Sequence, residues 1–198
     1  MENVLVIKTE TLGDILAENG LLCGREAEVM ALIRSEGEFI PRPAAELDPS
    51  YRQIIPYVSI VRGDEVFITH RLNKGGEARL HGKMALGVGG HMNEIDERGE
   101  DWLMNCLRRE VAEEVSMENM GELTLRGLIN DSSNDVGSVH LGFFFTLTTA
   151  GAVEVLETEK LAGGFVPIAS LLDNSDDMEG WSQIVAPRLV ELWTTGSF

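Results

Sequence analysis

The sequence predicts an α/β fold in which a mixed sheet lies between helices. Two runs rich in apolar and β-branched residues, within Tyr57 to Arg71, are separated by a turn at Arg62 to Glu65, which is typical of a β-hairpin. Further elements follow from the same patterns: strands at 123–129, 139–146 and 164–167, and a helix at 181–193 that is interrupted at Pro187. These elements predict one sheet-containing domain over residues 56–198.

Residues 1–55 predict an α+β extension that ends in a Pro-rich linker. We expect a strand at 3–8, a helix from a capping box at Thr11 to a stop at Gly20, and a helix at 25–34. The four prolines between Glu38 and Pro56 are expected to exclude regular helix there and indicate a linker or an edge crossing. The extension could cover a sheet edge, contact a partner in a homodimer or shape a substrate cleft.

The composition is that of an ordinary globular protein. Of the 198 residues, 43% are hydrophobic and 25% are charged, and no apolar run approaches the roughly 18 residues of a membrane span. The first residues lack the basic start and long apolar core of a signal peptide, so we expect a cytoplasmic protein that does not enter a membrane. Cys23 and Cys106 have no metal or redox spacing and are interpreted as reduced core thiols.

The most informative segment is an acidic run that ends a predicted helix. Glu110, Glu113 and Glu114 have the spacing that places side chains on one helix face. The helix is expected to end near Ser116 to Met117, where its macrodipole repels negative charge. A bound divalent cation would relieve this repulsion, and Mg²⁺ prefers oxygen ligands together with substrate phosphates. The alternative is a solvated acidic helix end.

This segment resembles the Nudix box, which reads Gly, five residues, Glu, seven residues, Arg-Glu, an aliphatic residue, any residue, Glu-Glu, any residue, Gly and an aliphatic residue. Arg109 to Val115 match its second half without a gap, after the glycines from Gly87 to Gly90. The first acid is Asp101 or, one residue out of register, Glu100, and Asp101 could equally be a helix N-cap.

Two departures from the box are visible. Ten residues separate Gly90 from Asp101, where the box has five, so the loop from Asn93 to Gly99 contains an insertion. Ser116 replaces the second glycine. Neither change removes one of the three glutamates.

The resemblance implies a Nudix-like α/β/α sandwich and a pyrophosphohydrolase that uses Mg²⁺ or Mn²⁺. By position, Glu113 and Glu114 would be metal ligands, Glu110 a third ligand or a water-activating base, and Arg109 a residue that orients the carboxylates. The backbone carbonyl of Gly90, or of Gly89 by one register, would complete the metal site. Family members often add an acid from a later loop, for which the candidates are Glu154, Glu157 and Glu159.

The charge distribution favours a small phosphorylated substrate over a nucleic acid polymer. The net charge is −17, which opposes binding to a phosphate backbone. Residues 50–83 nevertheless carry six basic and three acidic side chains. The candidate substrate contacts are Arg71, Arg79 and Lys83 from this region and His91 after the glycines.

The expected reaction is attack by metal-activated water on a diphosphate linkage, in a nucleoside diphosphate linked to another moiety. No proline occurs between Pro56 and Pro167, so the proline that follows the box in ADP-ribose hydrolases is missing. The tyrosine of diadenosine-polyphosphate hydrolases is missing too, because tyrosine occurs only at positions 51 and 57. Two alternatives remain, a non-catalytic Nudix-fold ligand-binding or regulatory protein and an isomerase acting on isopentenyl diphosphate, although the cysteines have no matching context for the latter.

Overall fold

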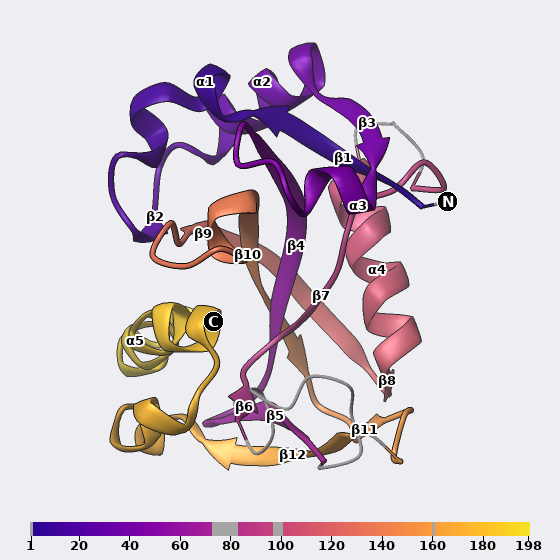
Figure 1. Ribbon diagram of the computed structural model, residues 1–198. Helices are drawn as coiled ribbons and strands as arrows, with labels where there is room; N and C mark the ends of the chain where they lie inside the picture. The colour runs from indigo at the N-terminus through magenta and orange to yellow at the C-terminus, as the bar shows by residue number, and fades with distance from the viewer. Residues whose placement is uncertain (1, 73–82, 97–100, 160) are drawn as a thin grey trace. The chain divides into compact units, whose positions relative to one another are not determined.

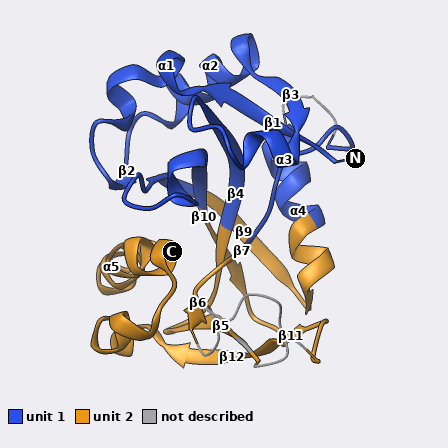
Figure 2. Cartoon of the chain, in the orientation of Figure 1, with its two compact units in different colours: residues 1–57, 89–109, 125–144 blue, residues 58–88, 110–124, 145–198 orange. Residues whose placement is uncertain are grey.

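The structure, a computed structural model, describes residues 2–72, 83–96, 101–159 and 161–198 (Figure 1). Arg79 and Glu100 lie outside these residues, and Arg71 is described by its backbone alone. The chain divides into two compact units that are interleaved in sequence (Figure 2). Unit 1 contains residues 1–57, 89–109 and 125–144, and unit 2 contains residues 58–88, 110–124 and 145–198.

Five elements contribute residues to both units. They are the strands β4 (Tyr51–Arg62), β7 (Val88–Gly89), β9 (Met120–Asn130) and β10 (His140–Thr149) and the helix α4 (Trp102–Glu114). The strand order in the sheet is β12-β5-β4-β10-β9-β2. The predicted α/β fold with a mixed sheet and helices is confirmed.

Unit 1 is built from the N-terminal strand and the short elements around it. Its further elements are β1 (Asn3–Lys8), α1 (Thr9–Leu12), the 3₁₀ turn η1 (Gly13–Leu16), β2 (Gly20–Leu22), α2 (Glu26–Glu36), β3 (Glu38–Pro41), α3 (Arg42–Ala45) and η3 (Gly137–Val139). Strand β1 pairs antiparallel with β3 and with the start of β4, where Ile7 faces Arg52. Val4 and Val6 of β1 form a buried cluster with Ala45 of α3, and Ile40 and Tyr51 pack against it. Burial of these apolar side chains stabilises the strand pairing.

The local structure of residues 9–56 differs from the prediction in two places. The expected capping box at Thr11 is wrong, because α1 already begins at Thr9 and the Thr11 hydroxyl donates to Glu36 instead. Gly13, with a φ of 49°, then ends α1 after one turn. The Pro-rich stretch contains β3, α3 and the first residues of β4, because Pro43 stands in the first turn of α3, where its missing N–H is harmless.

Unit 2 contains the hairpin and the C-terminal elements. Its further elements are β5 (Glu65–Arg71), β6 (Met84–Ala85), β8 (Val115–Met117), β11 (Val153–Val155), β12 (Leu161–Pro167), η4 (Ile168–Ser170), η5 (Leu172–Asp177) and α5 (Gly180–Thr195). The predicted hairpin is present, and Gly63 makes its turn with a φ of 61°. Strand β12 pairs with β5 over seven residues, and the Phe67 and Phe165 rings meet edge to face at 5.3 Å.

The C-terminal helix is longer and more regular than the sequence suggests. α5 extends from Gly180 to Thr195 as one element, with Pro187 inside it. Its apolar face buries Val185, Leu189 and Leu192. Within the described part of the chain, no helix combines the length and apolar character that membrane crossing requires.

Candidate active site

The glycine turn begins at β7 (Val88–Gly89), where the backbone approaches β4 closely. A Cβ atom on Gly89 would lie 2.3 Å from the carbonyl oxygen of Pro56, a distance that no side chain tolerates. The requirement for glycine at this position is therefore steric. After Gly90, Met92 donates its N–H to Ile54 and accepts one from Leu5, which fixes the end of the turn.

The inserted loop is held to the box helix by a buried ion pair. Both Asp96 carboxylate oxygens accept hydrogen bonds from Arg109, from Nε and Nη2 at 2.9 Å each. Asp96 is only 5% exposed. Burial opposes its charge, but hydrogen bonds, chiefly those from Arg109, outweigh this and hold the pKa of Asp96 below its ordinary value.

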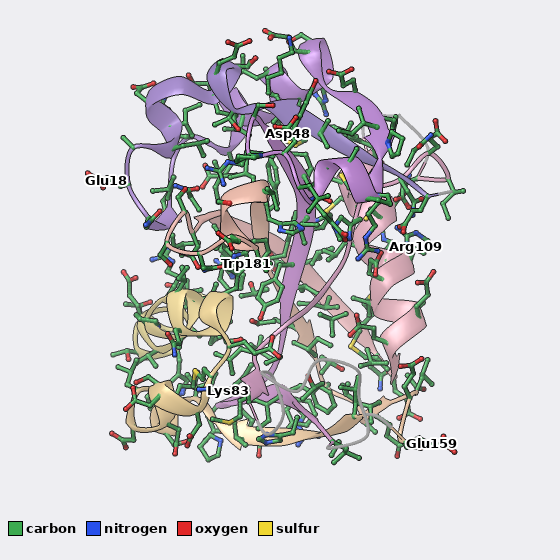
Figure 3. The ribbon with its side chains drawn as sticks, viewed as in Figure 1. Glu18, Asp48, Lys83, Arg109, Glu159 and Trp181 are labelled. Carbon is green, nitrogen blue, oxygen red and sulfur yellow. The ribbon has the colours of Figure 1, made fainter. Side chains whose placement is uncertain are left out.

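Arg109 also contacts the glycine turn. Its Nη2 donates to the carbonyl oxygen of His91 at 3.1 Å and lies 3.5 Å from the Cys106 sulfur. Figure 3 shows Arg109 on α4. Arg109 therefore joins three parts of unit 1: the helix, the glycine turn and the inserted loop.

The three box glutamates occupy the end of α4, within its last five residues. Glu110 and Glu114 are half-buried, and Glu113 is exposed. The helix ends at Glu114, two residues earlier than predicted, because the chain continues as β8 and Leu156 donates its N–H to the Glu114 carbonyl. Gly90 belongs to unit 1 and these glutamates belong to unit 2.

The donor set suits a hard cation, because all three side chains end in carboxylate oxygens. Within the described ranges, however, no group of three or more His, Cys, Asp or Glu side chains is arranged to hold a metal ion. The chemistry of the residues therefore fits a divalent cation. Among the described residues, however, they are not arranged as a preformed coordination site.

Comparison with known proteins gives a consistent result. The chain is 35% identical to Tm1382, a protein assigned to the Nudix hydrolases, whose crystal structure it matches with a TM-score of 0.83 over 96% of this chain and 100% of that one. The chain belongs to the Nudix hydrolases. No family model matches the sequence.

Two further relatives were found. Protein YmaB of Bacillus subtilis (strain 168) is 41% identical over 173 residues, which cover 83% of this chain and 84% of that protein. A Nudix hydrolase from Alicyclobacillus acidocaldarius shares the fold alone, with 14% identity and a TM-score of 0.52 over 71% of this chain and 91% of that one.

The departure from the Nudix box at Ser116 has a simple structural reason. Ser116 lies in β8 and pairs with Glu154 of β11, so its backbone is extended and needs no glycine. The reversal after β8 uses Asn119, with a φ of 53°, a left-handed conformation that asparagine adopts more readily than most residues. Glu154, Glu157 and Glu159 are all exposed.

The substrate-binding candidates lie at several places in the Nudix fold. Lys83 donates from Nζ to the Asp176 carbonyl at 2.6 Å, and Arg71 ends β5 opposite Leu161. Arg79 lies outside the described residues. Of the two cysteines, Cys106 is buried as expected, whereas Cys23 is exposed, so its interpretation as a core thiol is wrong.

His91 forms a pair with His140. Their Nε2 atoms are 3.3 Å apart, and His140 Nδ1 lies 2.6 Å from the Val136 carbonyl oxygen. A carbonyl cannot donate, so Nδ1 of His140 carries a proton. Burial, followed by the charges of Arg42 and the neighbouring imidazole, lowers the pKa of His91 to about 3. His91 is therefore neutral at pH 7, and the two rings share one hydrogen bond.

Three residues of this region were not assigned to the site from the sequence. Asp96 lies in the insertion, which the box pattern treats only as extra length. His140 contacts His91, and Arg52 contacts Gly137, only because distant segments of the chain pack together. The sequence offers one signal for Asp96: it is an acid in an insertion that precedes the helix containing Arg109.

Proposed function

We propose that the protein is a Mg²⁺- or Mn²⁺-dependent pyrophosphohydrolase that cleaves the diphosphate linkage of a nucleoside diphosphate joined to another moiety. The observation that carries this proposal is the position of Glu110, Glu113 and Glu114 in box register on the final turns of α4, in a chain that belongs to the Nudix hydrolases. Membership in the family supports hydrolase activity in general. The metal and the substrate are the finer parts of the proposal.

The proposal assigns a role to each box residue and to the metal. A divalent cation, when bound, lowers the pKa of a water molecule and neutralises charge on the diphosphate. Glu113 and Glu114 would hold the cation through their carboxylates, and Glu110 would act as a third ligand or accept the water's proton. The backbone carbonyl of Gly90 or Gly89 would add an uncharged oxygen.

Arg109 has a positioning role in this scheme. Its ion pair with Asp96 and its hydrogen bond to the His91 carbonyl hold the glycine turn at a fixed place along α4. Arg71, Arg79, Lys83 and His91 are the proposed contacts for the rest of the substrate. The ligand is a small molecule, and we expect action in the cytoplasm.

The experiment that tests this function is a screen of purified protein against diphosphate-containing compounds. Each compound is incubated with Mg²⁺, Mn²⁺ or EDTA, and the products are separated by chromatography and assayed for phosphate after phosphatase treatment. The expected result is metal-dependent cleavage of at least one nucleoside diphosphate derivative into two phosphorylated products or into a monophosphate and a free moiety. Absence of metal-dependent turnover across the panel would contradict the proposal.

One observation favours a second candidate, a non-catalytic Nudix-fold ligand-binding protein. Within the described ranges, no three metal-ligating side chains are gathered in one place. In the same screen, this candidate predicts a compound that raises the melting temperature without being consumed.

A further inference from the structure

Arg52 is a buried cation with no carboxylate partner among the residues that the structure describes. It is 5% exposed on β4. Five other arginines of the described chain form ion pairs: Arg25 with Glu28, Arg42 with Glu2 and Glu46, Arg62 with Glu65, Arg109 with Asp96, and Arg188 with Glu191. The net charge of the chain is −17, so acids are plentiful, yet no described acid pairs with the buried Arg52.

The partners that Arg52 does have are neutral. Nη1 donates to the Gly137 carbonyl and Nη2 donates to the Ser132 hydroxyl, each at 3.0 Å. Nε is buried and has no hydrogen-bond partner within the described chain. Among the described contacts, two of the five N–H donors of the guanidinium are used, and neither meets an anion.

One acid of the same loop is already engaged. Asp131 accepts hydrogen bonds from the backbone and hydroxyl of Ser133 and from the Asn134 amide. Asn134 in turn accepts the Gly137 N–H. In the described contacts, residues 131–137 bond mainly to one another. They offer Arg52 a carbonyl and a hydroxyl, but no carboxylate.

An uncompensated buried guanidinium creates a strong preference for an anion. Burial lowers the pKa of Arg52, but an arginine remains protonated at any physiological pH, so the charge cannot be lost by deprotonation. A desolvated positive charge is stabilised mainly by an opposite charge with matching hydrogen bonds. The planar guanidinium presents paired N–H groups that match two oxygens of a phosphoryl group.

Arg52 is connected to the glycine turn through the histidine pair. Arg52 donates to the Gly137 carbonyl, and the carbonyl oxygen of the preceding residue, Val136, lies 2.6 Å from Nδ1 of His140. His140 then touches His91, which directly follows Gly90. All these residues belong to unit 1. Contacts through residues 136–140 therefore link Arg52 to His91, the residue that follows the glycine turn.

We propose that Arg52 binds a phosphoryl group of the substrate, with the Ser132 hydroxyl as an adjacent polar contact. The identity of this ligand rests on the proposed diphosphate hydrolysis, whereas the anion site itself rests only on Arg52 and its surroundings. A purely structural role, in which Arg52 ties residues 132–137 to β4, is the alternative that the experiment must separate.

The experiment uses orthophosphate and pyrophosphate as probes, titrated calorimetrically into the EDTA-treated full-length protein at constant ionic strength. The variants are Arg52→Gln, Arg52→Lys and the matched control Arg62→Gln, which removes an arginine from the same strand that is paired with Glu65. Circular dichroism and thermal unfolding show whether each variant is folded. Omitting metal separates this site from the box glutamates, so loss of the proposed hydrolase function would leave the result unchanged.

The wild-type protein and Arg62→Gln are expected to bind one anion with similar affinity. Binding should weaken about tenfold or more in Arg52→Gln, because a charge-assisted paired contact is lost, and should be intermediate in Arg52→Lys, which retains charge without the planar fork. Undiminished binding in folded Arg52→Gln overturns the proposal. If that variant does not fold, absence of saturable binding to the wild type, or wild-type affinity in Arg52→Lys, overturns it.

A kinetic arm identifies the source of the phosphoryl group. Orthophosphate should inhibit turnover of the substrate found in the screen competitively, and Arg52→Lys should raise KM with a smaller effect on kcat. Non-competitive inhibition would mean that Arg52 binds a separate effector anion, which contradicts assignment to the substrate.

Discussion

Arg109 and Asp96 form a two-point ion pair between the box helix and the inserted loop, with both carboxylate oxygens 2.9 Å from guanidinium nitrogens. The insertion therefore does not simply lengthen the connection between the glycine turn and α4. It supplies a buried acid that fixes Arg109, and Arg109 also donates to the His91 carbonyl. This relationship explains how a box with five extra loop residues keeps its glycine turn tied to its helix.

Asp96→Asn is expected to lower the free energy of unfolding by about 1–3 kcal/mol at pH 7, because Arg109 loses its charged acceptor while Asn keeps the shape. Urea unfolding measures this. Asp48→Asn is a matched control, since Asp48 is exposed and its described side-chain hydrogen bond is local, from the Ser50 N–H. A loss in the control as large as that in Asp96→Asn would contradict the interpretation.

The same pair predicts a pH dependence of stability. Because the pKa of Asp96 is lowered on folding, its contribution is fully present above the unfolded value of about 3.9 and is lost as pH falls through the folded value. Unfolding followed from pH 7 to pH 2 should show the difference between wild type and Asp96→Asn shrinking below about pH 4. A difference that stays constant over this range would exclude a charged Asp96 as its source.

Metal should stabilise the protein, because a cation relieves repulsion among Glu110, Glu113 and Glu114. At 100 times its dissociation constant, a ligand adds about 2.7 kcal/mol, which corresponds to a rise in melting temperature of about 5–10 °C for a chain of this size. Differential scanning fluorimetry of EDTA-treated protein with added Mg²⁺ or Mn²⁺ measures the shift. An unchanged melting temperature over millimolar metal would remove the box glutamates as a metal site.

Glu114→Gln keeps the size of the side chain and removes the charge that a hard cation needs. Activity on the substrate found in the screen should fall by about 100-fold or more, and the metal-induced rise in melting temperature should shrink. Stability without metal should hold or increase, since one charge at the C-terminal end of α4 is removed. Glu118→Gln, an exposed change beyond the helix, is the control and should match wild type. Near wild-type turnover by Glu114→Gln would rule out the proposed mechanism while leaving the fold intact.

ADP-ribose and diadenosine polyphosphates are expected to be poor substrates relative to the best compound of the panel, because the proline and tyrosine associated with those activities are missing. Comparison of kcat/KM at saturating metal tests this. A preference for ADP-ribose would show that the residues after the box do not report the substrate here.

The sequence by itself determined the elements whose signal is local. The hairpin around Gly63, the strand at β10 and the register of Arg109 to Glu114 on one helix all follow from neighbouring residues, and the structure contains each of them. The alternation expected along β10 is wrong, because that strand is buried almost continuously. The resemblance to the Nudix box, and with it the family, rested on the same contiguous stretch. The ends of helices are harder to predict from the sequence. Helix α4 ends at Glu114 because β8 pairs with β11, whose residues lie almost 40 positions further along the chain.

Only the tertiary structure decided which distant residues meet. Asp96 faces Arg109, His91 faces His140, and Arg52 reaches Gly137, each across a separation that no sequence period encodes. The requirement for glycine at Gly89 likewise comes from the Pro56 carbonyl on another strand. The physical reason is that hydrophobic patterns specify which face of an element is buried, whereas the partner of a buried polar group depends on how the loops between elements close and which charges remain to be neutralised there.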